Sequence, residues 1–137
     1  LAGIGRGQLR VIEDRVKARR DIFRRHEEAF RDIEGVGFMP EAPYARSNRW
    51  LTVMTLDEDR LGVTPLDVIR ALESENIEAR PVWKPMHAQP CYAGCRKWGG
   101  AVSEELFARG LCLPSGTAMA EADVERVCAV IRAAVGA

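Results

Sequence analysis

The sequence predicts an α/β fold of the two-layer α+β type, in which a small three-stranded sheet is covered by helices. Hydrophobic patterns alternate along the chain in the order helix, strand, helix, strand, loop, helix, strand and helix. The 137 residues, with 47% hydrophobic and 29% charged side chains, are enough for one globular core. We therefore expect a single domain over residues 1–137.

The first expected element is a long amphipathic helix over residues 7–33, "GQLRVIEDRVKARRDIFRRHEEAFRDI". Hydrophobic residues recur along it at helical spacing: Leu9, Ile12, Val16, Phe23, Phe30 and Ile33. His26 falls on the same face, which favours a packed histidine over a ligand. Two opposite-charge pairs on the polar face have i,i+4 spacing: Glu13 with Lys17 and Asp21 with Arg25. A helix within residues 1–34 is longer than is needed to cover a three-stranded sheet. This length predicts an interdomain helix that reaches toward another domain.

Residues 48–137 are expected to form a sheet-and-helix unit, after an irregular segment rich in Gly and Pro at 34–47. Patterns of short strands and amphipathic helices follow one another: strands at 49–57, 78–83 and 111–114, and helices at 64–77, 103–110 and 121–135. Thr64 and Pro65 are typical of a helix start. Ser103 is expected to cap the next helix and Gly110 to end it.

Composition excludes several classes of function. The formal net charge is zero, which argues against nucleic acid as the main partner. No hydrophobic run approaches the roughly 20 residues of a membrane span, so no membrane role is expected. Cys112 and Cys128 lie within hydrophobic patterns and are expected to be buried. Cys91 and Cys95 do not have the usual redox or zinc spacing, which favours a reducing, cytoplasmic compartment.

Common catalytic motifs are absent from the sequence. There is no G-x-G-x-x-G, no P-loop and no G-x-S-x-G. A nucleophilic pair of Cys91 and His87 would lack a third group to orient the base. A zinc site at His87, Cys91 and Cys95 would lack a fourth ligand. Both alternatives are therefore weaker than a role in ligand recognition.

The segment "RPVWKPMHAQP", residues 80–90, has the residue types of a binding surface. Its three prolines restrict the backbone, which lowers the entropy cost of binding. Cationic side chains can hold anionic oxygens, an imidazole and an amide can bond hydroxyl groups, and an indole can stack on a ring or a sugar face. The candidate binding residues are Arg80, Trp83, Lys84, His87 and Gln89.

Several stretches resemble one enzyme family in its own order. "NIEARPVWKPMHAQP" and "LPSGTAMAEADVERV" resemble the C-terminal part of the DegT/StrS-type sugar aminotransferases, which are fold-type I pyridoxal-phosphate enzymes. "LAGIGRGQL" resembles their lead into the interdomain helix, and "RSNRWLTVMTLD" their first small-domain strand. The resemblance implies that the chain is the C-terminal small domain, with the cofactor-binding large domain expected upstream. The start at Leu1 rather than Met agrees with this expectation.

The resemblance also implies a reaction. An amino group would pass from an amino acid, typically L-glutamate, through pyridoxal 5'-phosphate to a nucleotide-linked keto-sugar. The nearest branch acts on 4-keto, 6-deoxy UDP-sugars for cell-surface or natural-product sugars. The enzymes of this family form dimers, so a homodimer is expected. A free-standing interaction or recognition module without catalysis is the alternative.

The same resemblance implies roles for individual residues. None of Lys17, Lys84 and Lys97 matches the context of the lysine that binds the cofactor, so no catalytic residue is expected in this chain. The loop with His87 and Gln89 is expected near the sugar-nucleotide pocket. His87 is the first candidate for a sugar or phosphate contact.

Overall fold

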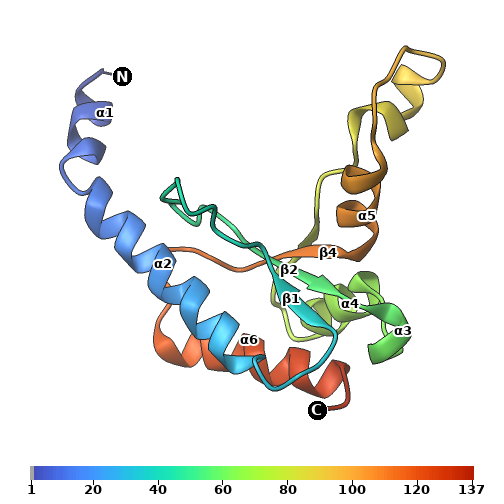
Figure 1. The fold of residues 1–137 in the computed structure, drawn as a ribbon. Coiled ribbons are helices and arrows are strands. Elements are labelled where there is room, and N and C mark those ends of the chain that lie inside the picture. The colour runs from blue at the N-terminus through green and yellow to red at the C-terminus, as the bar shows by residue number, and fades with distance from the viewer. Residues whose placement is uncertain (1) are drawn as a thin grey trace.

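The computed structural model describes residues 2–137. They include six α-helices: α1 (Ala2–Leu9), α2 (Ile12–Ala29), α3 (Glu58–Leu61), α4 (Pro65–Ser74), α5 (Ala101–Arg109) and α6 (Glu121–Ala134) (Figure 1). They also include four strands and two 3-10 turns: β1 (Val36–Phe38), β2 (Thr52–Leu56), β3 (Arg80–Pro81), β4 (Gly110–Leu113), η1 (Met86–Ala88) and η2 (Pro90–Tyr92). The predicted α+β class is confirmed.

The sheet has four antiparallel strands in the order β1-β2-β4-β3, so the predicted number of three strands is wrong. The additional strand, β1, lies in the segment expected to be irregular, and it extends the sheet to residues before 48. Its three residues are too few for a recognisable alternation, and its strand conformation comes from pairing with β2. β3 is an edge strand, as Pro81 predicts.

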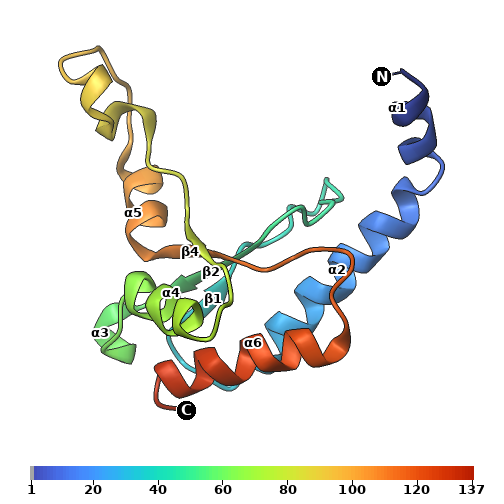
Figure 2. The same ribbon diagram turned by 180° about the vertical axis from the view of Figure 1, so that it is seen from behind.

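The hydrophobic core lies on the face of the sheet that carries α2, α4 and α6 (Figure 2). In β2, Thr52, Met54 and Leu56 point inward and are buried, while Val53 and Thr55 are half-buried. The helices, together with Phe30 just after α2, contribute fully or almost fully buried side chains to the same core: Ile22, Phe30, Val68, Leu72, Val124, Val127 and Ile131. The two cysteines expected to be buried, Cys112 and Cys128, are buried.

The long first helix is interrupted, contrary to the prediction of one helix over 7–33. Between α1 and α2, the amides of Arg10 and Val11 donate to the carbonyls of Gly7 and Gln8, which tightens the chain into a turn. The glycines of α1 weaken the helix there, because each costs backbone entropy. Only the second half of α2 packs on α6, and α1 has no buried residue (Figure 1).

The two predicted i,i+4 ion pairs on this helix do not form. Arg25 of α2 instead pairs with Glu121 of α6, and Asp21 pairs with Arg24. Glu13 pairs with Arg46 of the segment that follows β1. Contacts with other elements therefore take Glu13 and Arg25, whereas Asp21 pairs along the helix surface at i,i+3 instead of i,i+4 spacing.

The start of α4 follows the prediction, whereas the start of α5 does not. The Thr64 hydroxyl accepts a hydrogen bond from the Asp67 amide at 3.2 Å, and the Asp67 carboxylate accepts one from the Thr64 amide at 3.0 Å. α5 begins at Ala101 after Gly100, and the Ser103 hydroxyl donates back to the Gly100 carbonyl instead of capping the helix. α5 ends at Gly110, as predicted, and the chain continues directly into β4. None of the helices described in residues 2–137 combines the length and hydrophobicity of a membrane span.

Candidate functional site

The structure divides the predicted binding residues between two places. Arg80 and Trp83 line a groove at the β3 edge of the sheet. Lys84, His87 and Gln89 belong to residues 84–100, which we call the arm. The arm leaves the sheet after β3, passes through η1 and η2, and returns to α5 (Figures 1 and 2). The five residues therefore do not form one pocket.

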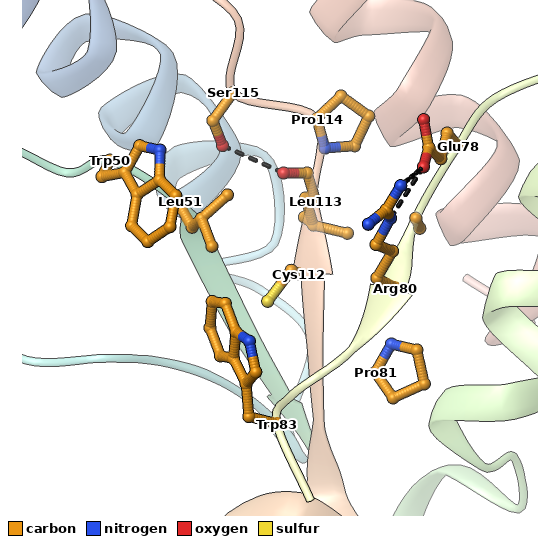
Figure 3. A pocket seen from close by; sticks show the side chains of 11 residues that line it. Trp50, Leu51, Glu78, Arg80, Pro81, Trp83, Cys112, Leu113, Pro114 and Ser115 are labelled. Carbon is orange, nitrogen blue, oxygen red and sulfur yellow. Dashed lines mark hydrogen bonds and ion pairs between the residues drawn. The ribbon is translucent and has the colours of Figure 1, made fainter.

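The sheet-edge groove has a volume of about 620 Å³ and a mainly hydrophobic wall (Figure 3). Trp50, from the residues before β2, and Trp83, from the residues after β3, lie with ring centroids 6.1 Å apart and planes tilted by 32°. Both indoles are about 60% exposed. Cys112 and Pro114 line the groove between the two tryptophans and Arg80 (Figure 3). Two exposed aromatic faces above a hydrophobic floor can hold a flat ring or the apolar face of a sugar.

Arg80 is not free to act as an isolated cation. Its Nε and Nη2 atoms lie 2.7 Å and 2.5 Å from the Glu78 carboxylate, and the two side chains are exposed (Figure 3). An anion that binds Arg80 would have to share the guanidinium with Glu78. We therefore regard the tryptophans as the stronger binding elements of this groove.

The arm is basic and aromatic. Its 17 residues include Lys84, Arg96 and Lys97 but no Asp or Glu. The guanidinium of Arg96 lies 4.7 Å from the ring centroid of Trp98, which is 78% exposed. Lys84 is also exposed, and the Gln89 side-chain amide donates to the Lys84 carbonyl at 3.4 Å. These groups offer positive charge and ring faces to an anionic, ring-containing ligand.

His87 is held firmly within this exposed arm. Its Nε2 atom lies 2.6 Å from Oε1 of Glu104 in α5, and its side chain is only 19% exposed. The hydrogen bond with His87, followed by the charge of Lys97, lowers the pKa of Glu104. Lys97 Nζ lies 3.5 Å from the same carboxylate oxygen. Glu104 therefore stays ionised and ties the beginning of the arm to its end.

Sequence reasoning missed two important residues, Trp50 and Glu104. Trp50 lies more than 30 positions before Trp83, and nothing local to either residue predicts their contact. Glu104 follows His87 by 17 positions, across the whole arm. A surface Glu in the first turn of a helix is common, so only the folded arm reveals this partner.

The two other interpretations of the arm gain no support. Cys91 and Cys95 are exposed free thiols. Among the described residues, no group of three or more His, Cys, Asp or Glu side chains could hold a metal ion. Among residues 2–137, the one hydrogen bond of the His87 ring is to Glu104, and none joins it to Cys91.

The described residues do not by themselves fit a pyridoxal-phosphate site. A lysine that binds the cofactor covalently should lie in an enclosed pocket, where burial tunes its amine. Lys17, Lys84 and Lys97 are all exposed, and Lys97 is paired with Glu104. These three lysines therefore do not match the lysine that such a site requires.

Comparison with known proteins agrees with the fold and with the resemblance of the sequence. The chain is 47% identical over 135 residues to EpsN of Bacillus subtilis, which is named as a pyridoxal phosphate-dependent aminotransferase. It is 31% identical over 131 residues to GDP-perosamine synthase of Caulobacter vibrioides. These alignments cover 96% and 95% of this chain but 34% and 35% of the relatives. The chain thus spans about a third of the length of the relatives that it matches.

Solved structures give the same result. The crystal structure of DesI in the presence of its TDP-sugar product superposes with a TM-score of 0.84 at 25% identity, over 93% of this chain and 33% of DesI. The profile of the DegT/DnrJ/EryC1/StrS aminotransferase family matches residues 1–132, which is nearly the whole sequence. The chain therefore belongs to the DegT/DnrJ/EryC1/StrS aminotransferase family.

Proposed function

We propose that this chain is the C-terminal small domain of a pyridoxal-phosphate-dependent aminotransferase that transfers an amino group to a nucleotide-linked keto-sugar. The family match over residues 1–132 is the observation that carries this proposal. The names of two similar proteins, GDP-perosamine synthase and DesI with its TDP-sugar product, support a nucleotide-sugar as the substrate class. L-Glutamate is the proposed amino donor, and the reaction serves the synthesis of cell-surface or natural-product sugars.

In this proposal, the cofactor is bound by a large domain upstream of these residues, and the chain contributes to substrate binding. The cofactor supplies the electron sink for the transfer of nitrogen. Trp83 offers a ring face at the sheet edge, and Arg80 a guanidinium that it shares with Glu78. Lys84, His87 and Gln89 offer a charge and hydrogen bonds along the arm. The basic character of the arm suits the diphosphate of a nucleotide-sugar.

The test uses the complete protein encoded by the reading frame that contains this segment. It is purified with pyridoxal 5'-phosphate, and the visible absorption of the bound cofactor is recorded before and after addition of L-glutamate. We expect a cofactor band that changes with L-glutamate. UDP-, GDP- and TDP-linked 4-keto-6-deoxy sugars are then supplied one at a time, and mass spectrometry identifies the amino sugar formed. Sedimentation of the same sample tests whether the enzyme is a homodimer.

Two results would contradict the proposal. A complete protein that binds no pyridoxal 5'-phosphate would have the fold of the family but could not be a pyridoxal-phosphate-dependent aminotransferase. A protein that accepts nitrogen from L-glutamate but transfers it to none of the three nucleotide-sugars would exclude the proposed acceptor class. In that case, free keto-sugars and keto acids would be tried as acceptors with the same assay.

A further inference from the structure

His87 and Glu104 form a carboxylate–imidazole pair whose geometry determines which ring nitrogen can meet a ligand. An ionised carboxylate only accepts hydrogen bonds, so the Nε2 atom, 2.6 Å from Glu104, carries the proton of this contact. In the neutral ring, Nδ1 then holds the lone pair. Within residues 2–137, Nδ1 has no hydrogen-bond partner.

The ring is fixed by more than this one hydrogen bond. A Cβ atom added to Gly100 would lie 2.9 Å from Cε1 and 3.0 Å from Nε2 of His87, so the ring edge lies directly against the Gly100 backbone. Gly100 has a φ of +121°, a conformation that residues with a side chain rarely adopt. The close packing and the hydrogen bond together hold the imidazole in one orientation, although most of the arm around it is exposed.

Glu104 is itself held in place at the start of α5. Its amide donates to the Gly100 carbonyl at 2.9 Å, and Lys97 lies near its carboxylate at 3.5 Å. The hydrogen bond with His87 and the charge of Lys97 keep the pKa of Glu104 below its usual value. The carboxylate therefore remains an acceptor at neutral pH, and in the neutral ring it selects the tautomer with the proton on Nε2.

We propose that Glu104 is a positioning residue that holds His87 with Nδ1 free to accept a hydrogen bond from a hydroxyl group of the nucleotide-sugar. This inference rests on the proposed function. It adds the atom that bonds the substrate, Nδ1 of His87, and the residue that orients it, Glu104. A pre-oriented acceptor costs less entropy on binding than a freely rotating one. The pair should therefore act on the affinity for the sugar substrate and leave the amino donor unaffected.

The test measures steady-state kinetics of the complete enzyme with L-glutamate and the accepted nucleotide-linked 4-keto-6-deoxy sugar. His87→Gln places an amide nitrogen near the position of Nε2, so it can keep the contact with Glu104, but it has no atom in place of Nδ1. We expect this variant to raise the KM for the nucleotide-sugar about tenfold, which corresponds to the loss of one hydrogen bond. The KM for L-glutamate should stay at the wild-type value, and thermal unfolding should show that the variant is folded.

Glu104→Leu should raise the same KM, because the ring loses the partner that orients it. In the double variant His87→Gln with Glu104→Leu, the second substitution should add little, since a residue that acts only through His87 has no effect once Nδ1 is gone. Glu105→Gln is the matched control. Glu105 lies next to Glu104 on α5 but pairs with Arg109 at 3.1 Å, so its removal should leave both KM values unchanged.

The possible failures are distinguishable. If the wild-type enzyme transfers no nitrogen from L-glutamate to any nucleotide-sugar, the proposed function falls, and this inference falls with it. If the wild-type enzyme is active and His87→Gln keeps the wild-type KM for the nucleotide-sugar, Nδ1 does not bond the substrate. Only this inference is then overturned. Fully additive effects of the two substitutions would overturn the positioning role of Glu104.

Discussion

At the scale of single residues, His26 shows how burial fixes a protonation state. Its imidazole is fully buried between α2 and α6. Nε2 lies 3.4 Å from the Pro114 carbonyl, and Nδ1 lies 3.5 Å from the Cys128 sulfur. Burial lowers the pKa of His26 to about 4 and raises the pKa of Cys128 to about 11. Both side chains are therefore neutral at pH 7, with Nε2 donating to the carbonyl and the thiol donating to Nδ1.

This burial predicts a loss of stability in mild acid. Because the pKa of His26 falls from 6.5 to about 4 on folding, the unfolded chain binds the proton more tightly. Burial of the neutral ring is compatible with the full free energy of unfolding above pH 6.5. As the pH falls toward 4, this free energy declines by about 3 kcal/mol in total. Urea unfolding of the 137-residue chain between pH 7.5 and 4 measures this decline. His26→Leu should flatten the pH dependence, and an unchanged slope in that variant would contradict the assignment.

At the scale of elements, α4 shows a complete reciprocal cap. Thr64→Ala removes the hydroxyl that accepts from the Asp67 amide, and we expect it to reduce the free energy of unfolding by about 1 kcal/mol. Ser74→Ala is the matched control on the same helix, because the Ser74 hydroxyl only donates back to the Ala71 carbonyl. Chemical unfolding of both variants measures the difference. Equal stabilities would show that the Thr64 hydroxyl contributes nothing to the helix start.

Elements with local signals could be predicted from the sequence, and elements defined by distant partners could not. The start of α4 depends on residues within one helical turn, so Thr64 and Pro65 predict it correctly. The strand β1 depends on its pairing with β2, which lies across the intervening loop. The break between α1 and α2 carries no Pro, and the glycines before it gave no decisive signal. Local chemistry therefore predicts a capped helix start such as that of α4 better than it predicts a short strand.

The candidate site shows the same division. The residue types of the 80–90 segment suggested binding, but their closeness in sequence does not place them in one pocket. An extended chain can advance roughly 3.3 Å per residue, so nine residues can separate Arg80 from Gln89 by up to about 30 Å. The partners that decide their roles, Trp50 and Glu104, come from elements on either side of the segment in sequence. A contact between distant elements has no local sequence signal.

At the scale of the whole molecule, the exposed large hydrophobic side chains other than Tyr44 and Leu66 lie in three regions. They lie on α1 and the start of α2, at the sheet-edge groove, and along the arm into α5: Ile4, Leu9, Val11, Ile12, Trp50, Trp83, Met86, Tyr92, Trp98 and Val102. Exposed hydrophobic surface of this kind usually meets another protein surface. We infer that these regions contact the remainder of the proposed enzyme.

This surface predicts that the separate 137-residue chain self-associates. Sedimentation velocity over a range of concentrations should show species larger than a monomer. Trp98→Ser should shift the distribution toward the monomer, because the Trp98 side chain is 78% exposed and lies on the arm. Ser103→Ala changes no hydrophobic surface of this size and serves as the control. A monomer at every concentration would argue that these side chains do not form a contact surface.

The arm leaves the sheet from β3 and returns through α5 into β4, and these two strands are hydrogen-bonded neighbours. The arm and α5 therefore form one long loop whose two ends are already held together by the pairing of β3 with β4. Doubling the length of such a loop costs only about 0.6 kcal/mol of closure entropy. Arms of different length and sequence could thus be exchanged between related enzymes while the same core folds beneath them. If the arm binds the nucleotide-sugar as proposed, its replacement should alter substrate choice with little effect on the stability of the core.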